Sequence, residues 1–227
     1  MPTTAIVTGA GSGFGLALTR ALSARGSTVI ACARDAARLR AAVADLPGVL
    51  AIAADVNDPA DRAAITGAAD RIDLLVHNAG ELGPAPLPRL AAYPVDALRG
   101  VLETTVLAPL ALTQLALPSL RAAAGTVVML SSDAAVEAYE GWGGYGAAKA
   151  ALDQLAAVLA VEELDLAVYA FDPGDMRTDM HQRAFPDQDI SDRPEPETVV
   201  PALLRLLDAR PASGRYRAAD LLAGSTA

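Results

Sequence analysis

The chain has 227 residues, of which 52% are hydrophobic, and it carries a formal net charge of −9. This length suits one domain over residues 1–227 with a sizeable core, and the apolar content excludes a disordered chain. The acidic balance argues against nucleic-acid and anionic-membrane partners, which need clustered basic residues.

The remaining composition narrows the protein class further. No uninterrupted apolar run reaches the roughly 18 residues of a membrane span, and the first residues lack a signal-peptide pattern. The one cysteine, Cys32, provides neither a disulfide framework nor a metal cluster. We therefore expect buried packing for Cys32, no metal site, no membrane association and a cytoplasmic location.

A glycine-rich turn opens the chain. Residues Thr4–Thr8 are apolar and β-branched, which predicts a short buried strand, and a helical pattern follows over 16–24. Gly9, Gly13 and Gly15 lie between the two elements. Such a turn leaves the N–H groups and dipole of the helix start free for an anion such as a pyrophosphate. The alternative is a tight turn without a ligand.

The second expected strand, 27–33, ends where dinucleotide-binding folds place an acidic acceptor for the ribose 2′-hydroxyl of NAD. Here Arg34 follows, and a guanidinium can hold a 2′-phosphate in a bidentate contact, which favours NADP. Asp35 keeps NAD possible. The third alternative is an Arg34 that is only solvated.

The later elements alternate between strand and helix. This alternation predicts an α/β fold, a Rossmann-type doubly wound parallel sheet of six or seven strands with helices on both faces. Strands are expected at 49–55, 72–77, 125–130 and 166–171, with a possible seventh at 215–218. Helices are expected at 96–117, 146–163 and 198–207. A surface loop is expected at 83–88, and a substrate lid or loop at 175–197.

The chemical centre is expected between Ser132 and Lys149, the only lysine of the chain. Tyr145 precedes Lys149 by four residues, so a helix places both on one face. A phenol titrates near ~10 in water, and a neighbouring cation lowers that pKa toward the range of a general base. The alternative is an exposed tyrosine and lysine without chemical function.

These motifs together resemble the single-domain short-chain dehydrogenase/reductase superfamily over nearly the full chain. They are Thr8-Gly9-x-x-x-Gly13-x-Gly15, Asp55-Val56, Asn78-Ala79-Gly80, Ser132, Tyr145-x-x-x-Lys149, and Pro173-Gly174 followed by Thr178. The resemblance implies an oxidoreductase that transfers hydride between a nicotinamide cofactor and a carbonyl or secondary alcohol. It also implies that Tyr145 is the general acid and base, that Lys149 binds the ribose, and that Ser132 orients the substrate oxygen.

The same resemblance implies a set of cofactor-binding positions. They are Gly9, Ser12, Gly13, Phe14, Gly15, Arg34, Asp55, Val56, Asn78, Ala79, Gly80, Tyr145, Lys149, Pro173, Gly174 and Thr178. One position departs from the family pattern, because Thr105 stands where the family usually has an asparagine that holds a water beside the lysine. Threonine lacks the amide donor, which puts the proton relay behind Lys149 in question.

The substrate is weakly specified. Tyr139 and Trp142 precede the catalytic tyrosine and Met180 follows Thr178, which indicates an apolar ketone, aldehyde or secondary alcohol. These side chains are equally well explained as loop packing. His181 is expected to be a solvated loop residue, with a second catalytic base as the alternative.

NADPH-dependent reduction is the favoured reading of the function. Two alternatives remain: an NAD-linked alcohol dehydrogenase, and an NADP-binding regulatory or assembly protein with weak catalysis. The helices at 96–117 and 146–163 are apolar over more than one stripe. In the resembling family these helices commonly form a dimer face, so a homodimer or homotetramer is expected.

Overall fold

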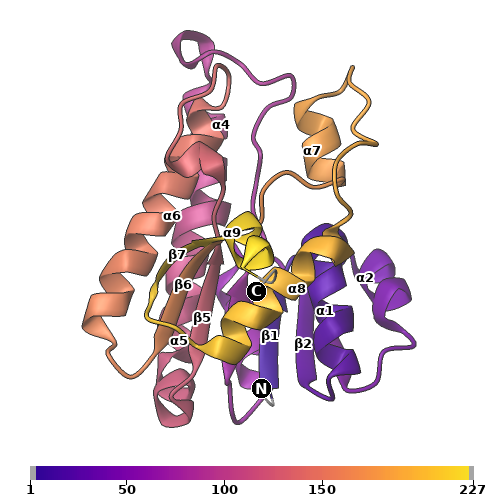
Figure 1. Cartoon of the computed structure of the whole chain (residues 1–227), viewed down its shortest axis with the longest axis vertical. Coiled ribbons are helices and arrows are strands. Elements are labelled where there is room, and N and C mark those ends of the chain that lie inside the picture. Colours follow the sequence, from indigo (N-terminus) through magenta and orange to yellow (C-terminus); the bar gives the residue numbers. More distant parts are fainter. Residues whose placement is uncertain (1–3, 225–227) are drawn as a thin grey trace.

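A computed structural model of the chain describes residues 4–224. Within this part, all strands belong to one parallel seven-stranded sheet with the order β3-β2-β1-β4-β5-β6-β7 (Figure 1). The strands are β1 (Thr4–Thr8), β2 (Thr28–Ala33), β3 (Val49–Ala53), β4 (Leu74–His77), β5 (Thr126–Leu130), β6 (Ala167–Asp172) and β7 (Gly214–Arg217). The expected Rossmann-type sheet is confirmed. The strand order reverses between β1 and β4, which is the position where such sheets bind ligands.

Helices cover both faces of the sheet. One layer contains α1 (Gly13–Ala24), α2 (Ala36–Val43), α8 (Pro196–Ala209) and α9 (Ala218–Ala223); the other contains α3 (Pro59–Gly67), α5 (Ala108–Ala123) and α6 (Gly143–Glu162), with α4 (Val95–Leu102) beside α6. The period of two along each strand explains the two cores. In β1, Ala5 and Val7 pack under the first layer and Ile6 under the second.

The long apolar helix expected at 96–117 is interrupted. A π-helical turn over Glu103–Leu107 separates α4 from α5, and the helical run extends to Ala123. Pro109 lacks the N–H that the Thr105 carbonyl needs in an α-helix, so the backbone widens at this point. The run Val95–Ala123 has the length and composition of a membrane span. However, Leu112 and Leu120 are fully buried against the sheet, as in a core helix.

The segment 175–197 contains a short helix that the sequence analysis did not assign. This helix, α7 (Asp179–Ala184), stands beyond the end of the sheet where the strands finish (Figure 1). The Thr178 hydroxyl accepts a hydrogen bond from the His181 N–H at 3.2 Å and so caps the helix start. The rest of the segment, up to α8, is irregular.

Candidate active site

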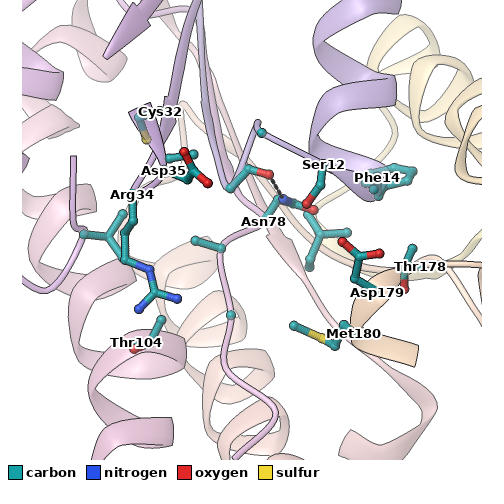
Figure 2. A pocket seen from close by; sticks show the side chains of 18 of the residues that line it. Ser12, Phe14, Cys32, Arg34, Asp35, Asn78, Thr104, Thr178, Asp179 and Met180 are labelled. Atoms are coloured by element: carbon teal, nitrogen blue, oxygen red, sulfur yellow. Dashed lines mark hydrogen bonds between the residues drawn. The ribbon is translucent and has the colours of Figure 1, made fainter. Parts of the chain in front are cut away.

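The glycine turn between β1 and α1 is shaped by close contacts. Gly9 and Gly13 have φ values of 66° and 52°, a region that disfavours side chains. A Cβ on Gly15 would lie 2.4 Å from the Asn78 side-chain nitrogen. That amide donates to the carbonyl of Thr8 at 2.9 Å and to that of Gly9 at 3.2 Å; Asn78 is labelled in Figure 2. Asn78 therefore fixes the turn that exposes the first N–H groups of α1.

A cavity of about 380 Å³ runs along the carboxyl edge of the sheet beside this turn. The structure brings most of the expected cofactor positions to its wall: Gly9, Ser12, Gly13, Phe14, Arg34, Asp55, Val56, Asn78, Ala79, Gly80, Tyr145, Lys149, Pro173 and Thr178. Gly15 lies behind the turn, and Gly174 lines a neighbouring cavity. Sequence reasoning missed several lining residues, notably Arg38, Thr104, Ser131, Met176 and Asp179.

Arg34 and Asp35, the two candidates to contact the adenosine ribose of the cofactor, differ in whether their side chains already have hydrogen-bond partners. Asp35 caps α2, because its carboxylate accepts the Arg38 N–H at 2.9 Å. The exposed Arg34 guanidinium has no hydrogen bond or ion pair with any residue in the described range 4–224. It extends toward Thr104 on one side of the cavity, whereas Asp179 lies on the other side (Figure 2). Of the two, Arg34 is the group left open for a ligand.

Lys149 lies deep in the cavity wall. Its side chain is 4% exposed, and its Nζ donates to the Leu130 carbonyl at 2.5 Å. The same Nζ lies 5.5 Å from the centre of the Tyr145 ring. Burial lowers the pKa of Lys149 to about 8, although the carboxylates of Asp153 and Asp172 act in the opposite direction. The predicted juxtaposition of cation and phenol is present.

The electrostatics of Tyr145 differ from the expectation. Burial raises the pKa of its phenol, as do Asp133, Asp172 and Asp175, while a hydrogen bond with Ser132 lowers it. The expected lowering by Lys149 is not seen in this structure. The phenol is therefore protonated at neutral pH, the form that donates to a carbonyl oxygen. The Ser132 hydroxyl itself lies 2.9 Å from the Asp133 carboxylate, to which it donates.

Two neighbouring threonines of the π turn occupy different places. Thr105 is fully buried, and its hydroxyl accepts the Glu81 N–H at 3.3 Å. A Cβ built on Gly80 would lie 3.8 Å from Lys149 Nζ and 3.9 Å from the Thr105 hydroxyl, so both side chains converge on Gly80. Thr104 lines the cavity and accepts from the Asn57 amide at 3.0 Å. Of the two threonines, Thr105 is therefore the one whose hydroxyl shares the surroundings of Gly80 with Lys149, and its role in a proton relay stays a prediction.

A charged cluster that the sequence did not reveal supports this side of the site. Arg215 of β7 donates to Asp153 at 3.1 Å, to Asp172 at 2.8 Å, and to the Ser132 carbonyl at 2.9 Å. Ser131 also donates to Asp153 at 2.8 Å. Burial raises the pKa of Asp153, against the opposing effects of Ser131 and Arg215. The cluster thus ties β7 to the backbone of the proposed substrate-orienting serine.

A second cavity, of about 300 Å³, meets the first at Tyr145, which lines both. The expected substrate residues Tyr139, Trp142 and Met180 lie in its wall. The Trp142 ring contacts Tyr145 edge-on, with centroids 5.5 Å apart. The expectation for His181 is wrong, because its side chain is only 9% exposed and lines this cavity rather than standing in solvent.

The residues present fit a nicotinamide dinucleotide. The glycine turn leaves room where side chains would obstruct a ligand, and the cavity continues from the turn to Tyr145 and Lys149. Within residues 4–224, no group of three or more His, Cys, Asp or Glu side chains is arranged to hold a metal ion.

Comparisons with known proteins agree with this geometry. The family model described as short chain dehydrogenase matches residues 3–189. L-xylulose reductase of Bos taurus is 32% identical over 223 residues, which cover 91% of this chain and 89% of the relative. L-fucose dehydrogenase of Bos taurus is 32% identical over 179 residues, covering 76% and 66%. A short chain dehydrogenase from Shigella flexneri 2a, solved in complex with NADP, superposes with a TM-score of 0.87 at 27% identity, covering 95% and 96%.

Proposed function

Since the chain belongs to the short-chain dehydrogenase family, we propose that it is an NADPH-dependent reductase of ketones or aldehydes. One observation carries the proposal: Tyr145 lines both the cavity beside the glycine turn and the cavity with the aromatic wall. A proton donor at this junction can reach the oxygen of a carbonyl whose carbon faces the nicotinamide.

The chain's own residues have separate tasks in this reaction. NADPH, when bound, supplies the hydride that adds to the carbonyl carbon. Tyr145 donates its proton to the developing alkoxide, consistent with the raised pKa that keeps the phenol protonated. Lys149 presents a buried cation toward the ribose and the phenol. Ser132 orients the substrate oxygen once its hydroxyl turns from Asp133.

The preference for NADPH over NADH rests on Arg34. Its guanidinium is open at the cavity wall, while Asp35 is engaged in capping α2. The neighbouring structure from Shigella flexneri holds NADP, which supports the same choice. We expect Arg34→Ala to weaken NADPH binding by about tenfold, the effect of one charge-assisted contact, and to change NADH binding less than twofold. Equal weakening of both cofactors would favour an NAD-linked alcohol dehydrogenase.

The activity itself is tested by NADPH consumption with a panel of ketones and aldehydes. Tyr145→Phe removes the proton donor, so we expect turnover to fall by at least about a hundredfold while NADPH still binds. The binding measurement shows that the variant is folded. Tight NADPH binding without turnover on any panel member would instead support a regulatory or assembly protein. This alternative remains because Thr105 stands where the family usually has an asparagine.

We also propose that the chain forms a homodimer through α5 and α6. Large apolar side chains on these helices are exposed in the single chain: Leu107 at the end of the π turn, Leu110, Leu115, Val158 and Val161. A second copy would cover them, because exposed apolar patches of this kind mark interfaces. Sedimentation of the wild type and of Val161→Asp tests the proposal. A monomeric wild type at micromolar concentration would overturn it.

A further inference from the structure

The substrate cavity has an unusual charge balance. Its apolar side is formed by Leu82, Trp142, Met176, Met180 and Phe185, and its polar side by Ser132, Asp133, Tyr139, Asp175, Thr178 and His181. The charged residues in this wall are Asp133 and Asp175, and no lysine or arginine lines it within the described range 4–224. Apart from its aromatic surface, the cavity therefore offers acceptors rather than cations.

The two carboxylates differ in their basic partners. Among the described residues, no basic side chain lies within 4 Å of Asp133. Asp175 forms only long contacts with basic groups, at 3.6 Å to Arg193 and 3.7 Å to His181 Nδ1, whereas Arg193 pairs more closely with Asp192 at 2.7 Å. A charge that lines a cavity without a close partner is available to a ligand of the opposite sign.

Tyr139 lies between two carboxylates at the wall of the cavity. The Tyr139 hydroxyl lies 3.0 Å from an Asp133 oxygen and 2.8 Å from a Glu137 oxygen. A phenol carries one proton, so it satisfies only one of these two carboxylates at a time. The carboxylate that the phenol leaves unpaired can accept from another donor, and an ammonium with several N–H groups can supply it.

His181 provides an independent indication. The side chain is about nine-tenths buried, and its Nε2 has no hydrogen-bond partner in the structure. Its Nδ1 lies 3.7 Å from Asp175, whose charge favours a proton on that nitrogen. Nε2 is then an acceptor, so this buried group in the cavity wall also requires a donor.

We propose that the substrate is a carbonyl compound, or the corresponding secondary alcohol, that carries a protonated amine close to the reacting carbon. The inference rests on the reductase function proposed above and specifies its substrate class. Asp133 holds the Ser132 hydroxyl at 2.9 Å, so an amine bound at Asp133 lies next to the carbonyl oxygen. Asp175 provides the second anionic group, and the aromatic faces of Trp142 and Tyr139 add attraction for a cation. An organic cation fits this wall better than a metal ion, because no group of three or more His, Cys, Asp or Glu side chains in residues 4–224 is arranged to hold a metal.

The test measures binding, so its outcome does not depend on turnover. Trp142 is the only tryptophan of the chain and lines the cavity, so its fluorescence reports occupancy. The protein is saturated with NADP⁺, which cannot reduce a ketone, and titrated with two phenyl ketones of the same shape. One carries a dimethylammonium group on the β-carbon, and in the other an isopropyl group replaces it.

We expect the cationic ketone to bind at least about tenfold more tightly, the effect of one charge-assisted hydrogen bond. Asp175→Asn and Asp133→Asn should each reduce this ratio severalfold. Asp187→Asn is the matched control, because it removes the same charge from an exposed position of the lid that does not line the cavity.

Equal binding of the two ketones would overturn the inference, and so would a ratio that Asp187→Asn lowers as much as Asp175→Asn does. The proposed function has a separate readout, which is NADPH consumption with the same two ketones. Preferential binding of the cation without any turnover would support the cation site and count against the reductase. Turnover of both ketones with equal affinities would support the reductase and count against the cation site.

Discussion

Arg38 of α2 and Asp179 at the start of α7 form an ion pair at 2.7 Å, and both residues line the cofactor cavity. The pair joins α2, which directly follows the loop with Arg34, to the segment 175–197. Both side chains are more than half exposed, so the pair contributes at most about 1 kcal/mol to stability. Its position suggests that Asp179 competes with a cofactor phosphate for Arg38.

The competition predicts a gain from removing the carboxylate. We expect Asp179→Asn to tighten NADPH binding by up to about fivefold while changing NADH binding less than twofold, because Arg38 becomes available to the 2′-phosphate. Titration with both cofactors measures the ratio. Asp96→Asn, which breaks the exposed pair with Arg99 on α4, should leave the ratio unchanged. An unaltered ratio in Asp179→Asn would show that Arg38 does not contact the phosphate.

The buried charge of Lys149 is expected to lower the stability of the fold although catalysis requires it. Its pKa is about 8 in the folded chain against an ordinary value of 10.5, so burying the charged form costs up to about 3 kcal/mol. Below pH 8 the lysine is charged in both states and the folded chain bears the full cost. Between pH 8 and 10.5 the folded chain loses the proton first and the cost declines.

We therefore expect Lys149→Met to raise the free energy of unfolding at pH 7 by up to about 3 kcal/mol and to abolish turnover. The gain should shrink as the pH approaches 10.5. Urea unfolding at pH 7 and pH 10 measures both values. Arg40→Met, at an exposed position of α2, should show no such pH dependence. A Lys149→Met protein that is less stable than the wild type at pH 7 would contradict the argument.

Most of the sheet was predictable because its inner strands are largely apolar runs, unlike β7, which is Gly-Arg-Tyr-Arg. Every residue of β4, β5 and β6 is buried, and such runs are bounded by turn residues that a sequence displays directly. The glycine turn was predictable for a related reason, since Gly9 and Gly13 adopt backbone angles that other residues rarely reach. Both the strands and the glycine turn depend on residues close together in the chain, so the sequence alone was sufficient to predict them.

Contacts between distant segments could not be predicted in the same way. Arg38 and Asp179 are 141 residues apart, and Arg215 and Asp153 are 62 apart. No local pattern links such pairs, and one arginine among 17 gives no signal of its role. The pKa of Tyr145 was misjudged for the same reason. Lys149 was visible four residues away, whereas burial, which raises the pKa most, and the smaller effects of Asp133, Asp172 and Asp175 depend on how the chain folds.

The π turn predicts different effects for its two threonines. Thr105→Val leaves the Glu81 N–H without its acceptor and removes a hydroxyl that, like the Lys149 amine, lies close to Gly80. We expect a loss of about 1–2 kcal/mol in stability and a lower kcat. Thr104→Val, its neighbour in the cavity wall, should raise the KM for the cofactor more than it lowers kcat. Steady-state kinetics of both variants separate the roles. A purely structural Thr105 would lower stability and leave kcat unchanged.

Arg215 predicts coupling between β7 and catalysis. Without its guanidinium, Asp153 and Asp172 remain at 15% and 4% side-chain exposure without their basic partner. Removal of one partner from a largely buried ion pair typically costs about 3–5 kcal/mol. Because Asp153 keeps the Ser131 hydrogen bond, we expect Arg215→Met to lose about 3 kcal/mol. Turnover should also fall, because the Ser132 carbonyl loses its shorter hydrogen bond and keeps only the 3.4 Å contact with the Ser131 hydroxyl.

The matched control for Arg215 lies two residues further along the same strand. Arg217 is exposed, and Arg217→Met removes the same charge as Arg215→Met. We expect this control to change the free energy of unfolding by less than about 0.5 kcal/mol. Urea unfolding gives the stability of each variant. Kinetics at a temperature where both are folded then separate loss of activity from loss of structure. If folded Arg215→Met retains the wild-type kcat, the contact with Ser132 stabilises the fold without positioning the serine.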